Sequence, residues 1–99
     1  DEMFVNSVVE VETLYTHYEL LDAIHQIEQN GNRVRKERWG NRTLDVDIIF
    51  YDDIVVGDSE LAIPHPDMVN RDFVLTPMME MNENFVHTLL NKRIKDLKA

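Results

Sequence analysis

The sequence predicts a small α+β domain in which helices pack on a layer of strands. Two stretches, 3–13 and 43–51, alternate apolar and polar residues as half-buried strands do, and residues 17–30 between them carry a helical apolar period. The order strand, helix, strand, helix within 99 residues favours an α+β layer. A chain of this length suits one domain, so we expect residues 1–99 to form a single domain.

Composition narrows the class of protein. There is no cysteine, which excludes disulfides and thiolate metal sites. The formal net charge of −9 argues against general binding to nucleic acid or to an anionic membrane, because phosphate groups would repel the surface. No apolar run approaches the ~20 residues of a membrane span, and the first residues lack the pattern of a signal peptide. We therefore expect a cytoplasmic protein that binds neither nucleic acid nor membrane.

The first half of the chain predicts one strand and one helix. Residues 3–13, MFVNSVVEVET, would form the strand. Thr16 is a good N-cap for a helix over residues 17–30, and Glu19 completes a capping box three positions later. The sequence Asn30-Gly31-Asn32 predicts the end of this helix, because Gly and Asn accept a left-handed cap. The apolar stripe of the helix is formed by Leu20, Leu21, Ala23, Ile24 and Ile27.

A charged loop and a second strand follow. Residues 33–42 have neither a helical nor a strand period, which indicates a loop. Residues 43–51, TLDVDIIFY, predict a strand, with a turn at Asp52-Asp53 and a short return strand over Ile54–Val56.

The last third predicts an irregular segment and two helices. Residues 64–71, PHPDMVNR, contain two prolines and are expected to be irregular. Asp72 would cap a helix over residues 73–81, with Pro77 tolerated in its first turns. The tail, 88–99, predicts a short amphipathic helix with its apolar residues inward: Leu89, Leu90, Ile94 and Leu97.

The pair Asp45 and Asp47 is the first candidate site. Two aspartates two positions apart on one strand place their carboxylates on the same face. Carboxylates are ligands that suit Mg²⁺, which usually binds through one or two of them together with substrate phosphates. The alternative is a solvent-facing strand with two exposed acids, because the Asp-x-Asp pattern is common by chance.

A basic cluster directly precedes the aspartates. Five of the ten basic residues lie in ten positions, in a chain that is otherwise strongly acidic. Arginine side chains match phosphate oxygens in a bidentate way, and phosphoryl transfer needs such charges around the transferred group. A solvated loop is the alternative on charge alone. The five residues are Arg33, Arg35, Lys36, Arg38 and Arg42.

Several single residues are candidates with two interpretations each. Trp39 either anchors the charged loop or offers a plane for stacking a flat heterocycle. His65, between two prolines, either donates to a phosphate or caps a turn. Arg71 could add a further phosphate contact, and Glu28 lies at the end of the apolar stripe near the charged loop.

Two sequence motifs contain most of these candidate residues. RWGNRTLDVDI and PHPDMVNRDFVLTPM closely resemble the signatures of the 6-hydroxymethyl-7,8-dihydropterin pyrophosphokinase family, R-W-G-P-R-T-L-D-[LIV]-D-[IL] and P-H-P-x-[ML]-x-x-R-x-F-[VM]-L-x-P-[LM]. Only Asn41 departs from them, where the family has proline. The resemblance covers essentially the whole chain and implies transfer of the β,γ-pyrophosphoryl group of ATP to the pterin hydroxymethyl, with release of AMP in folate biosynthesis.

The resemblance also implies roles for individual residues. Asp45 and Asp47 would bind two Mg²⁺ ions that bridge the ATP phosphates, and with Arg33 and Arg42 they would form the catalytic set. The residues implied to bind ATP are Glu28, Arg35, Arg38, Arg42, His65 and Arg71. Those implied to lie at the pterin are Phe4, Asn6, Trp39, Asp45 and Phe73.

The resemblance further implies a ferredoxin-like sheet with helices packed on it. Family members begin with a strand, a helix and a second strand that have no counterpart here, so we expect a fragment, truncated or part of a longer protein. The alternatives to a complete enzyme are an inactive fragment, a nucleotide- or metal-binding portion of a larger folate-pathway protein, and a structural partner domain. Fusion to other folate-pathway domains is compatible with each.

Overall fold

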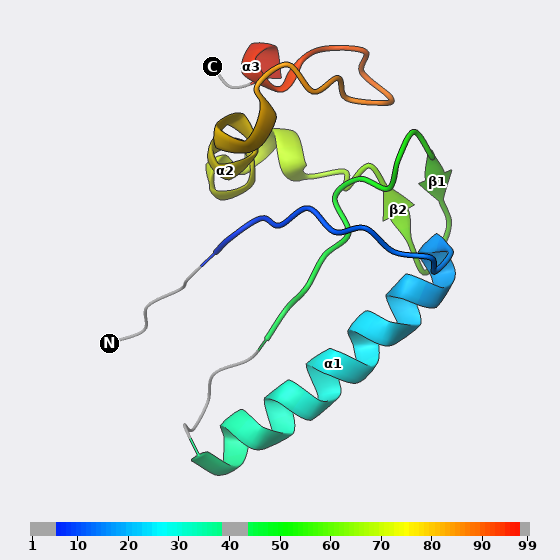
Figure 1. Cartoon of the computed structure of the whole chain (residues 1–99), viewed down its shortest axis with the longest axis vertical. Helices are drawn as coiled ribbons and strands as arrows, with labels where there is room; N and C mark the ends of the chain where they lie inside the picture. Colours follow the sequence, from blue (N-terminus) through cyan, green and yellow to red (C-terminus); the bar gives the residue numbers. More distant parts are fainter. Residues whose placement is uncertain (1–5, 39–43, 98–99) are drawn as a thin grey trace. The chain divides into compact units, whose positions relative to one another are not determined.

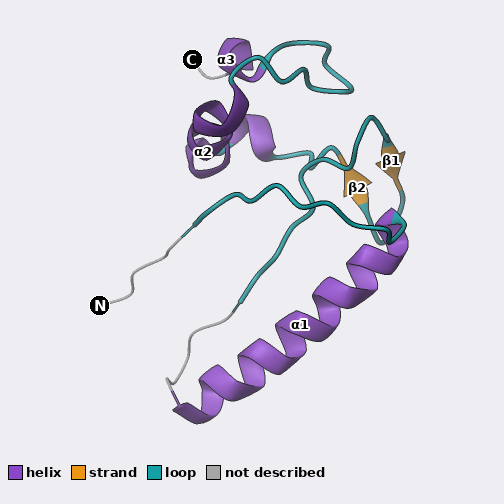
Figure 2. Ribbon diagram, in the orientation of Figure 1, coloured by secondary structure: helices purple, strands orange, loops and turns teal. Residues whose placement is uncertain are grey.

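The computed structural model describes residues 6–38 and 44–97, with side chains for residues 6–31 and 44–97. These residues form two compact units, one of residues 12–48 and one of residues 6–11 with 49–97. Within them, the regular elements are three α-helices, one 3-10 helix and a two-stranded antiparallel sheet (Figures 1 and 2). The predicted α+β class is therefore confirmed.

Helix α1, His17–Arg38, begins where the sequence predicts. The hydroxyl of Thr16 accepts the backbone N–H of Glu19 at 3.2 Å, and the Glu19 carboxylate accepts the backbone N–H of Thr16 at 2.8 Å. These two bonds are the reciprocal capping box, and they satisfy donors that the first helical turn would otherwise leave unpaired.

The capping box makes Thr16 a measurable contributor to stability. We expect the Thr16→Ala variant to lower the free energy of unfolding of α1 by about 1 kcal/mol, because the backbone N–H of Glu19 loses its acceptor. Thr16→Ser keeps the hydroxyl and should recover most of that loss. Amide hydrogen exchange in the first two turns of α1 measures the effect, and equal exchange in all three proteins would contradict it.

The predicted end of this helix at Asn30-Gly31-Asn32 is wrong, as is the predicted loop over 33–38, because α1 continues to Arg38. Gly31 costs about 1 kcal/mol relative to alanine in a helix interior. The residues after it are mostly arginine and lysine, which are good helix formers and are favoured near a helix C-terminus by its dipole. The remainder of the predicted loop, 39–42, lies outside the described residues.

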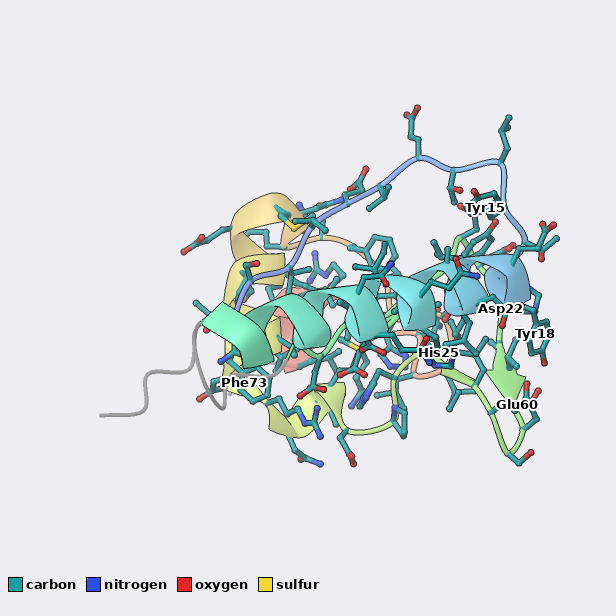
Figure 3. The ribbon with its side chains drawn as sticks, turned by 90° about the horizontal axis from the view of Figure 1, so that it is seen from below. Tyr15, Tyr18, Asp22, His25, Glu60 and Phe73 are labelled. Carbon is teal, nitrogen blue, oxygen red and sulfur yellow. The ribbon has the colours of Figure 1, made fainter. Side chains whose placement is uncertain are left out.

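The apolar stripe of α1 is buried only in part. Ile24 is 8% exposed, whereas Ile27, predicted on the same stripe, is 55% exposed. Figure 3 shows Tyr18, Asp22 and His25 following one another along one side of the helix, as spacings of four and three residues require. The remaining members of the predicted stripe are half-buried: Leu20, Leu21 and Ala23.

Both long predicted strands are wrong for the residues that the structure describes. Residues 6–13 and 44–51 run as loops, and neither is paired into a sheet. An alternating sequence becomes a strand only when a neighbouring strand completes its hydrogen-bond ladder. The side chains of Val9 and Val11, predicted to share a face, are 74% and 67% exposed.

The sheet that the structure contains is a short hairpin. Strand β1, Val56–Gly57, pairs antiparallel with β2, Ala62–Ile63, so the predicted return strand over Ile54–Val56 begins later than expected. The Asp58 carboxylate closes the turn by accepting the N–H groups of Glu60 and Leu61, each at 2.8 Å. The turn predicted at Asp52-Asp53 is confirmed, and Asp52 has a φ of 47°.

The segment 64–71 is irregular as predicted, apart from the 3-10 helix η1, Met68–Asn70. Helix α2, Asp72–Asn82, follows, and its N-cap is Arg71, one residue before the predicted Asp72. Asp72 instead lies in the first turn, where a carboxylate interacts favourably with the helix dipole. Pro77 lies inside α2 as predicted, and it cannot donate a hydrogen bond to the carbonyl of the residue four positions earlier.

Of the predicted helix over 88–99, the described residues 88–97 form only α3, Ile94–Leu97. Leu89 and Leu90 are 65% and 45% exposed and lie in a turn, so their predicted inward position is wrong, whereas Ile94 is fully buried. These residues form a turn and not a helix because an antiparallel bridge between Val86 and Arg93 joins the chain on the two sides of the turn.

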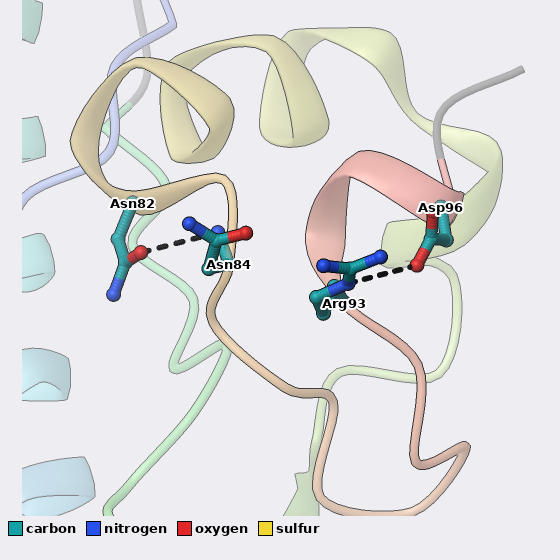
Figure 4. Close-up of polar contacts among 4 residues, drawn as sticks. All are labelled: Asn82, Asn84, Arg93 and Asp96. Atoms are coloured by element: carbon teal, nitrogen blue, oxygen red, sulfur yellow. Dashed lines mark hydrogen bonds and ion pairs between the residues drawn. The ribbon is translucent and has the colours of Figure 1, made fainter.

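Side-chain bonds stabilise the ends of both C-terminal helices (Figure 4). Asn82 Oδ1 accepts the N–H of Asn84 at 3.1 Å where α2 ends. Arg93 Nε donates to Asp96 Oδ2 at 3.2 Å across the first turn of α3.

The core of the second unit lies between η1, α2 and α3. Met68, Leu75 and Ile94 are each no more than 1% exposed, and Val74 is 6% exposed. Burying such side chains stabilises the fold by about 1.5–3 kcal/mol each. Partly buried residues packed against this cluster include Val8, Ile49, Phe50, Met78, Phe85 and Leu97.

His87 makes the stability of this unit depend on pH. It is 4% exposed, its Nδ1 accepts the N–H groups of Leu89 at 3.1 Å and Leu90 at 2.9 Å, and its ring meets Phe50 edge-on at 5.4 Å. Burial lowers the pKa of His87 below its ordinary value of 6.5. Both folded and unfolded chains are neutral at this position above that pH, so the stability is complete there.

We expect the free energy of unfolding to fall as the pH drops below 6.5, because the unfolded chain then binds a proton that folded His87 refuses. In His87→Asn, the amide oxygen can accept the same N–H groups without titrating, so this acid-dependent loss should be smaller. Urea unfolding at pH 7.5 and pH 5.0 measures the difference, with His25→Asn as a control for loss of an exposed histidine. An unchanged pH dependence in His87→Asn would contradict the assignment.

Candidate functional site

The predicted aspartate pair lies in the unit formed by residues 12–48. Asp45 and Asp47 are both exposed, and one residue, Val46, separates them. They belong to a loop, so the strand that was expected to carry them is absent from the described residues. The carboxylates are nevertheless accessible to a ligand from solvent.

The backbone between the two aspartates is attached to α1. The N–H of Val46 donates to Oε2 of Glu28 at 2.7 Å, a short hydrogen bond to a carboxylate. One helical turn later, a β-carbon on Gly31 would lie 3.0 Å from Cδ2 of Leu44, closer than ordinary van der Waals contact. The absence of a side chain at Gly31 therefore lets Leu44 pack directly against the helix.

The donor set at the aspartates fits a cation that shares its coordination with a ligand. Among residues 6–31 and 44–97, no group of three or more His, Cys, Asp or Glu side chains is placed to hold a metal ion. Two carboxylates without a third protein ligand correspond to the common way in which proteins bind Mg²⁺ together with phosphates. They do not correspond to a closed structural metal site.

A second group of predicted residues lies in the unit formed by residues 6–11 and 49–97. Nδ1 of His65 accepts the backbone N–H of Asp67 at 3.2 Å, and the Asp67 carboxylate forms an ion pair with Arg71 at 3.6 Å. The Arg71 guanidinium lies 5.6 Å from the centroid of the Phe73 ring. Asp67 thus links His65 to Arg71, and Arg71 in turn contacts Phe73, although the sequence predicts these three residues separately.

The hydrogen bond from Asp67 fixes the tautomer of neutral His65. Because Nδ1 accepts, the ring proton is on Nε2, which makes that nitrogen a donor. A donor of this kind suits an anionic oxygen. The interpretation of His65 as a turn cap is supported, since the same bond closes the turn before η1.

Arg71 and Phe73 combine a cation with an accessible ring. Phe73, marked in Figure 3 at the start of α2, is 48% exposed, and Arg71 is half-buried. A half-exposed phenyl ring at a helix N-terminus can stack on a flat ligand, while the neighbouring guanidinium can bind an anion.

Asp67 belongs to this group although the sequence interpretation above gives it no role. The available signal was its spacing of four residues from Arg71, which on a helical turn brings opposite charges together. The amide of Val46 was not predictable in the same way, since its partner Glu28 lies eighteen residues earlier.

The remaining predicted residues are less completely placed. Asn6 is exposed in the loop that precedes Val8. Phe4, Trp39 and Arg42 lie outside the described residues. The backbone of α1 carries three more predicted residues, Arg33, Arg35 and Arg38, whose side chains are not among those described.

The sequence model of the 7,8-dihydro-6-hydroxymethylpterin-pyrophosphokinase family matches residues 1–83 of this chain.

The chain belongs to this family.

Two of the similar curated proteins are named pyrophosphokinases, and a third is named a bifunctional protein. The 2-amino-4-hydroxy-6-hydroxymethyldihydropteridine pyrophosphokinase of Haemophilus influenzae is 43% identical over 83 residues, which are 84% of this chain and 52% of that protein. The enzyme of that name from Aquifex aeolicus is 35% identical over 95 residues, 96% of this chain and 59% of that protein. The bifunctional protein FolKE of Lactococcus lactis strain IL1403 is 49% identical over 78 residues, 79% of this chain and 22% of that protein.

The pyrophosphokinase match includes both groups of candidate residues. Asp45 and Asp47 lie within residues 1–83, and so do His65, Arg71 and Phe73. The chain spans about half the length of the Haemophilus and Aquifex pyrophosphokinases that it matches. In the part of the chain that the structure describes, no helix is both long and apolar enough to cross a membrane.

Proposed function

We propose that this protein takes part in folate biosynthesis as a pyrophosphokinase, transferring the pyrophosphoryl group of ATP to 6-hydroxymethyl-7,8-dihydropterin with release of AMP. The observation that carries the proposal is the family match over residues 1–83, which spans both groups of candidate residues. The names of the relatives support the same reaction class.

The proposed reaction is a displacement at phosphorus. The hydroxymethyl oxygen of the pterin forms a bond to the β-phosphorus of ATP, and the bond between that phosphorus and the oxygen bridging to the α-phosphate breaks. AMP leaves with the bridging oxygen, and the hydroxyl proton passes to solvent or to a nearby base. In reactions of this class the protein mainly positions the reactants and stabilises the charge on the phosphate oxygens.

We propose that Asp45 and Asp47 hold two Mg²⁺ ions together with the ATP phosphates. Their exposure and the lack of a third ligand in the described residues support a shared site. When bound, the ions neutralise phosphate charge and orient the transferred group. Asp45 is also proposed to contact the pterin hydroxymethyl.

The proposed phosphate contacts come from hydrogen-bond donors, most of which are arginine side chains. His65 would donate from Nε2, and Arg71 would bind a phosphate oxygen as a guanidinium. The basic residues of α1 and the segment after it would neutralise the remaining charge, and with Glu28 they complete the proposed nucleotide set: Arg33, Arg35, Arg38 and Arg42.

The proposed pterin contacts use aromatic rings and a polar edge. Phe73 would stack on the flat pterin, as its 48% exposure permits. Asn6 would hydrogen-bond the edge of the ring, because its amide offers both donors and an acceptor. Phe4 and Trp39 complete the proposed pterin set.

The finer fold and setting are part of the same proposal. We propose a ferredoxin-like sheet for the whole pyrophosphokinase domain, formed with the part of the family length that this chain does not span. Fusion to a second folate-pathway activity is a further possibility to test, since the FolKE relative is named as bifunctional. We also propose a cytoplasmic location, on the basis of the composition of the chain.

The direct test is AMP release by this chain with ATP, Mg²⁺ and 6-hydroxymethyl-7,8-dihydropterin, omitting each component in turn. We expect AMP only when all three are present. AMP formed without the pterin would indicate an ATPase and contradict the proposal. Nucleotide binding without turnover would favour the second candidate, a nucleotide-binding portion of a larger protein. The observation that favours this candidate is that the match spans only 52% of the Haemophilus protein.

Substitutions of Arg71 and Asp67 are expected to change the Kd for ATP in opposite directions. Arg71→Ala should raise the Kd for ATP about tenfold, because a charge-assisted hydrogen bond is lost. Asp67→Asn removes a carboxylate that competes with phosphate for Arg71 and should lower the Kd about two- to threefold, since the exposed ion pair is weak. Isothermal titration with ATP and Mg²⁺ measures both. A higher Kd in Asp67→Asn would show that the carboxylate supports binding.

A further inference from the structure

The attachment of the aspartate segment to α1 has a consequence for the proposed reaction. We infer that Glu28 is a positioning residue, which fixes the placement of Asp45 and Asp47 through the backbone N–H of Val46. The inference rests on the proposed function, because it concerns how the two carboxylates of that function are held.

The geometry supports positioning through the backbone. Val46 is the residue between the two aspartates, and its N–H donates to Glu28 Oε2 at 2.7 Å. A bond at this amide restrains the peptide that joins Asp45 to Val46, and so restrains the residues on both sides of it. The segment has no sheet partner among the described residues, so the attachment to α1 replaces the ladder that would normally hold it.

A second contact fixes the register. Gly31 lies three residues after Glu28 on α1, and Leu44 lies two residues before Val46. The site of a β-carbon on Gly31 is 3.0 Å from Leu44 Cδ2, so only glycine leaves room for this side chain without displacing it. The two contacts, Glu28 with Val46 and Gly31 with Leu44, together set which residues of the segment lie against α1.

Glu28 acts through Val46 and not as a third metal ligand. In the part of the chain with described side chains, Glu28 forms no cluster with Asp45 and Asp47 that could hold a metal ion. Its side chain is half-buried, whereas both aspartates are exposed. The predicted contact of Glu28 with ATP is a separate property, and the two can be distinguished by experiment.

The test compares Glu28→Ala with Glu28→Gln, because the glutamine oxygen can still accept the Val46 N–H. Gln29→Ala is the matched control on the next, exposed position of α1. Hydrogen exchange of the Val46 amide, measured by NMR on the full chain without ligand, reports the attachment itself. Binding of α,β-methylene-ATP, with and without Mg²⁺, reports the placement of the carboxylates.

We expect Glu28→Ala to speed Val46 exchange about tenfold and to raise the Kd for α,β-methylene-ATP about tenfold with Mg²⁺ present. Glu28→Gln should remain within about threefold of the parent chain in both measurements, and Gln29→Ala should equal it. Far-UV circular dichroism must show that α1 persists in each variant. Without Mg²⁺, the Kd of Glu28→Ala for the analogue should differ less from that of the parent chain than it does with Mg²⁺, because the carboxylates then hold no ion.

Two results would overturn the inference. The first is unchanged Val46 exchange in Glu28→Ala, and the second is weaker analogue binding in Glu28→Gln equal to that in Glu28→Ala, which would indicate a direct role of the charge at the nucleotide. The exchange measurement needs no substrate. Failure of the parent chain to form AMP would therefore count against the proposed function and leave the exchange result to decide the role of Glu28.

Discussion

We expect Asp47→Asn to form AMP at least about 10³-fold more slowly than the parent chain. Asparagine has nearly the same shape as aspartate but carries no charge, and an amide oxygen is a weak substitute for a carboxylate at Mg²⁺. Among the residues with placed side chains no group of three or more acids or histidines could hold the ion, and the nearby Glu28 carboxylate is bonded to the Val46 N–H. Loss of one charge should therefore remove most of the productive binding.

The measurement has two parts. AMP formation is followed at saturating ATP and pterin, and binding of α,β-methylene-ATP is titrated at increasing Mg²⁺. Asp53→Asn is the control, because Asp53 is also exposed, lies six residues later in a turn and changes the net charge equally. If Asp47→Asn binds the analogue with an unchanged Mg²⁺ requirement, Asp47 is not a metal ligand.

Leu75→Ala should produce the largest loss of stability in the unit that contains α2. Leu75 is 1% exposed in the cluster with Met68, Val74 and Ile94. Truncating such a side chain removes its transfer free energy and leaves a cavity, which together lower the free energy of unfolding by about 3 kcal/mol. A domain of this size has a total stability of only about 5–15 kcal/mol, so this is a large fraction.

Urea unfolding followed by far-UV circular dichroism measures the loss. Thr76→Ala is the control, since Thr76 is the next residue of α2 and is exposed. Its free energy of unfolding should stay within about 0.5 kcal/mol of the parent value or rise, because alanine is the better helix former. A midpoint for Leu75→Ala equal to that of Thr76→Ala would mean that the cluster does not determine the stability.

The sequence predicts best where the signal is local. The capping box of Thr16 and Glu19 and the turn at Asp52 each depend on residues within a few positions, and both are found. The α2 helix is also found, with its N-cap displaced by one residue.

Local sequence patterns give wrong predictions where the structure depends on contacts with residues far away in the sequence. The alternation in residues 3–13 and 43–51 predicts strands, but pairing depends on a neighbour that the pattern does not specify, and the described residues 6–13 and 44–51 form none. Gly31 is read as a helix end, although its contact with Leu44 makes it useful inside α1. For the candidate site, the residues are a prediction from the sequence motifs, while the links through Val46 and Asp67 needed coordinates.

The exposed valines of the first segment have a consequence for how the molecules meet one another. Val9 and Val11 present apolar side chains that are 74% and 67% exposed, on a protein whose formal net charge is −9. Such surfaces attract when two molecules touch, and the shared negative charge repels them before they do. The shared negative charge therefore opposes contact between these valines on two molecules. Salt, which reduces that repulsion to a range of about 8 Å at physiological ionic strength, weakens this protection.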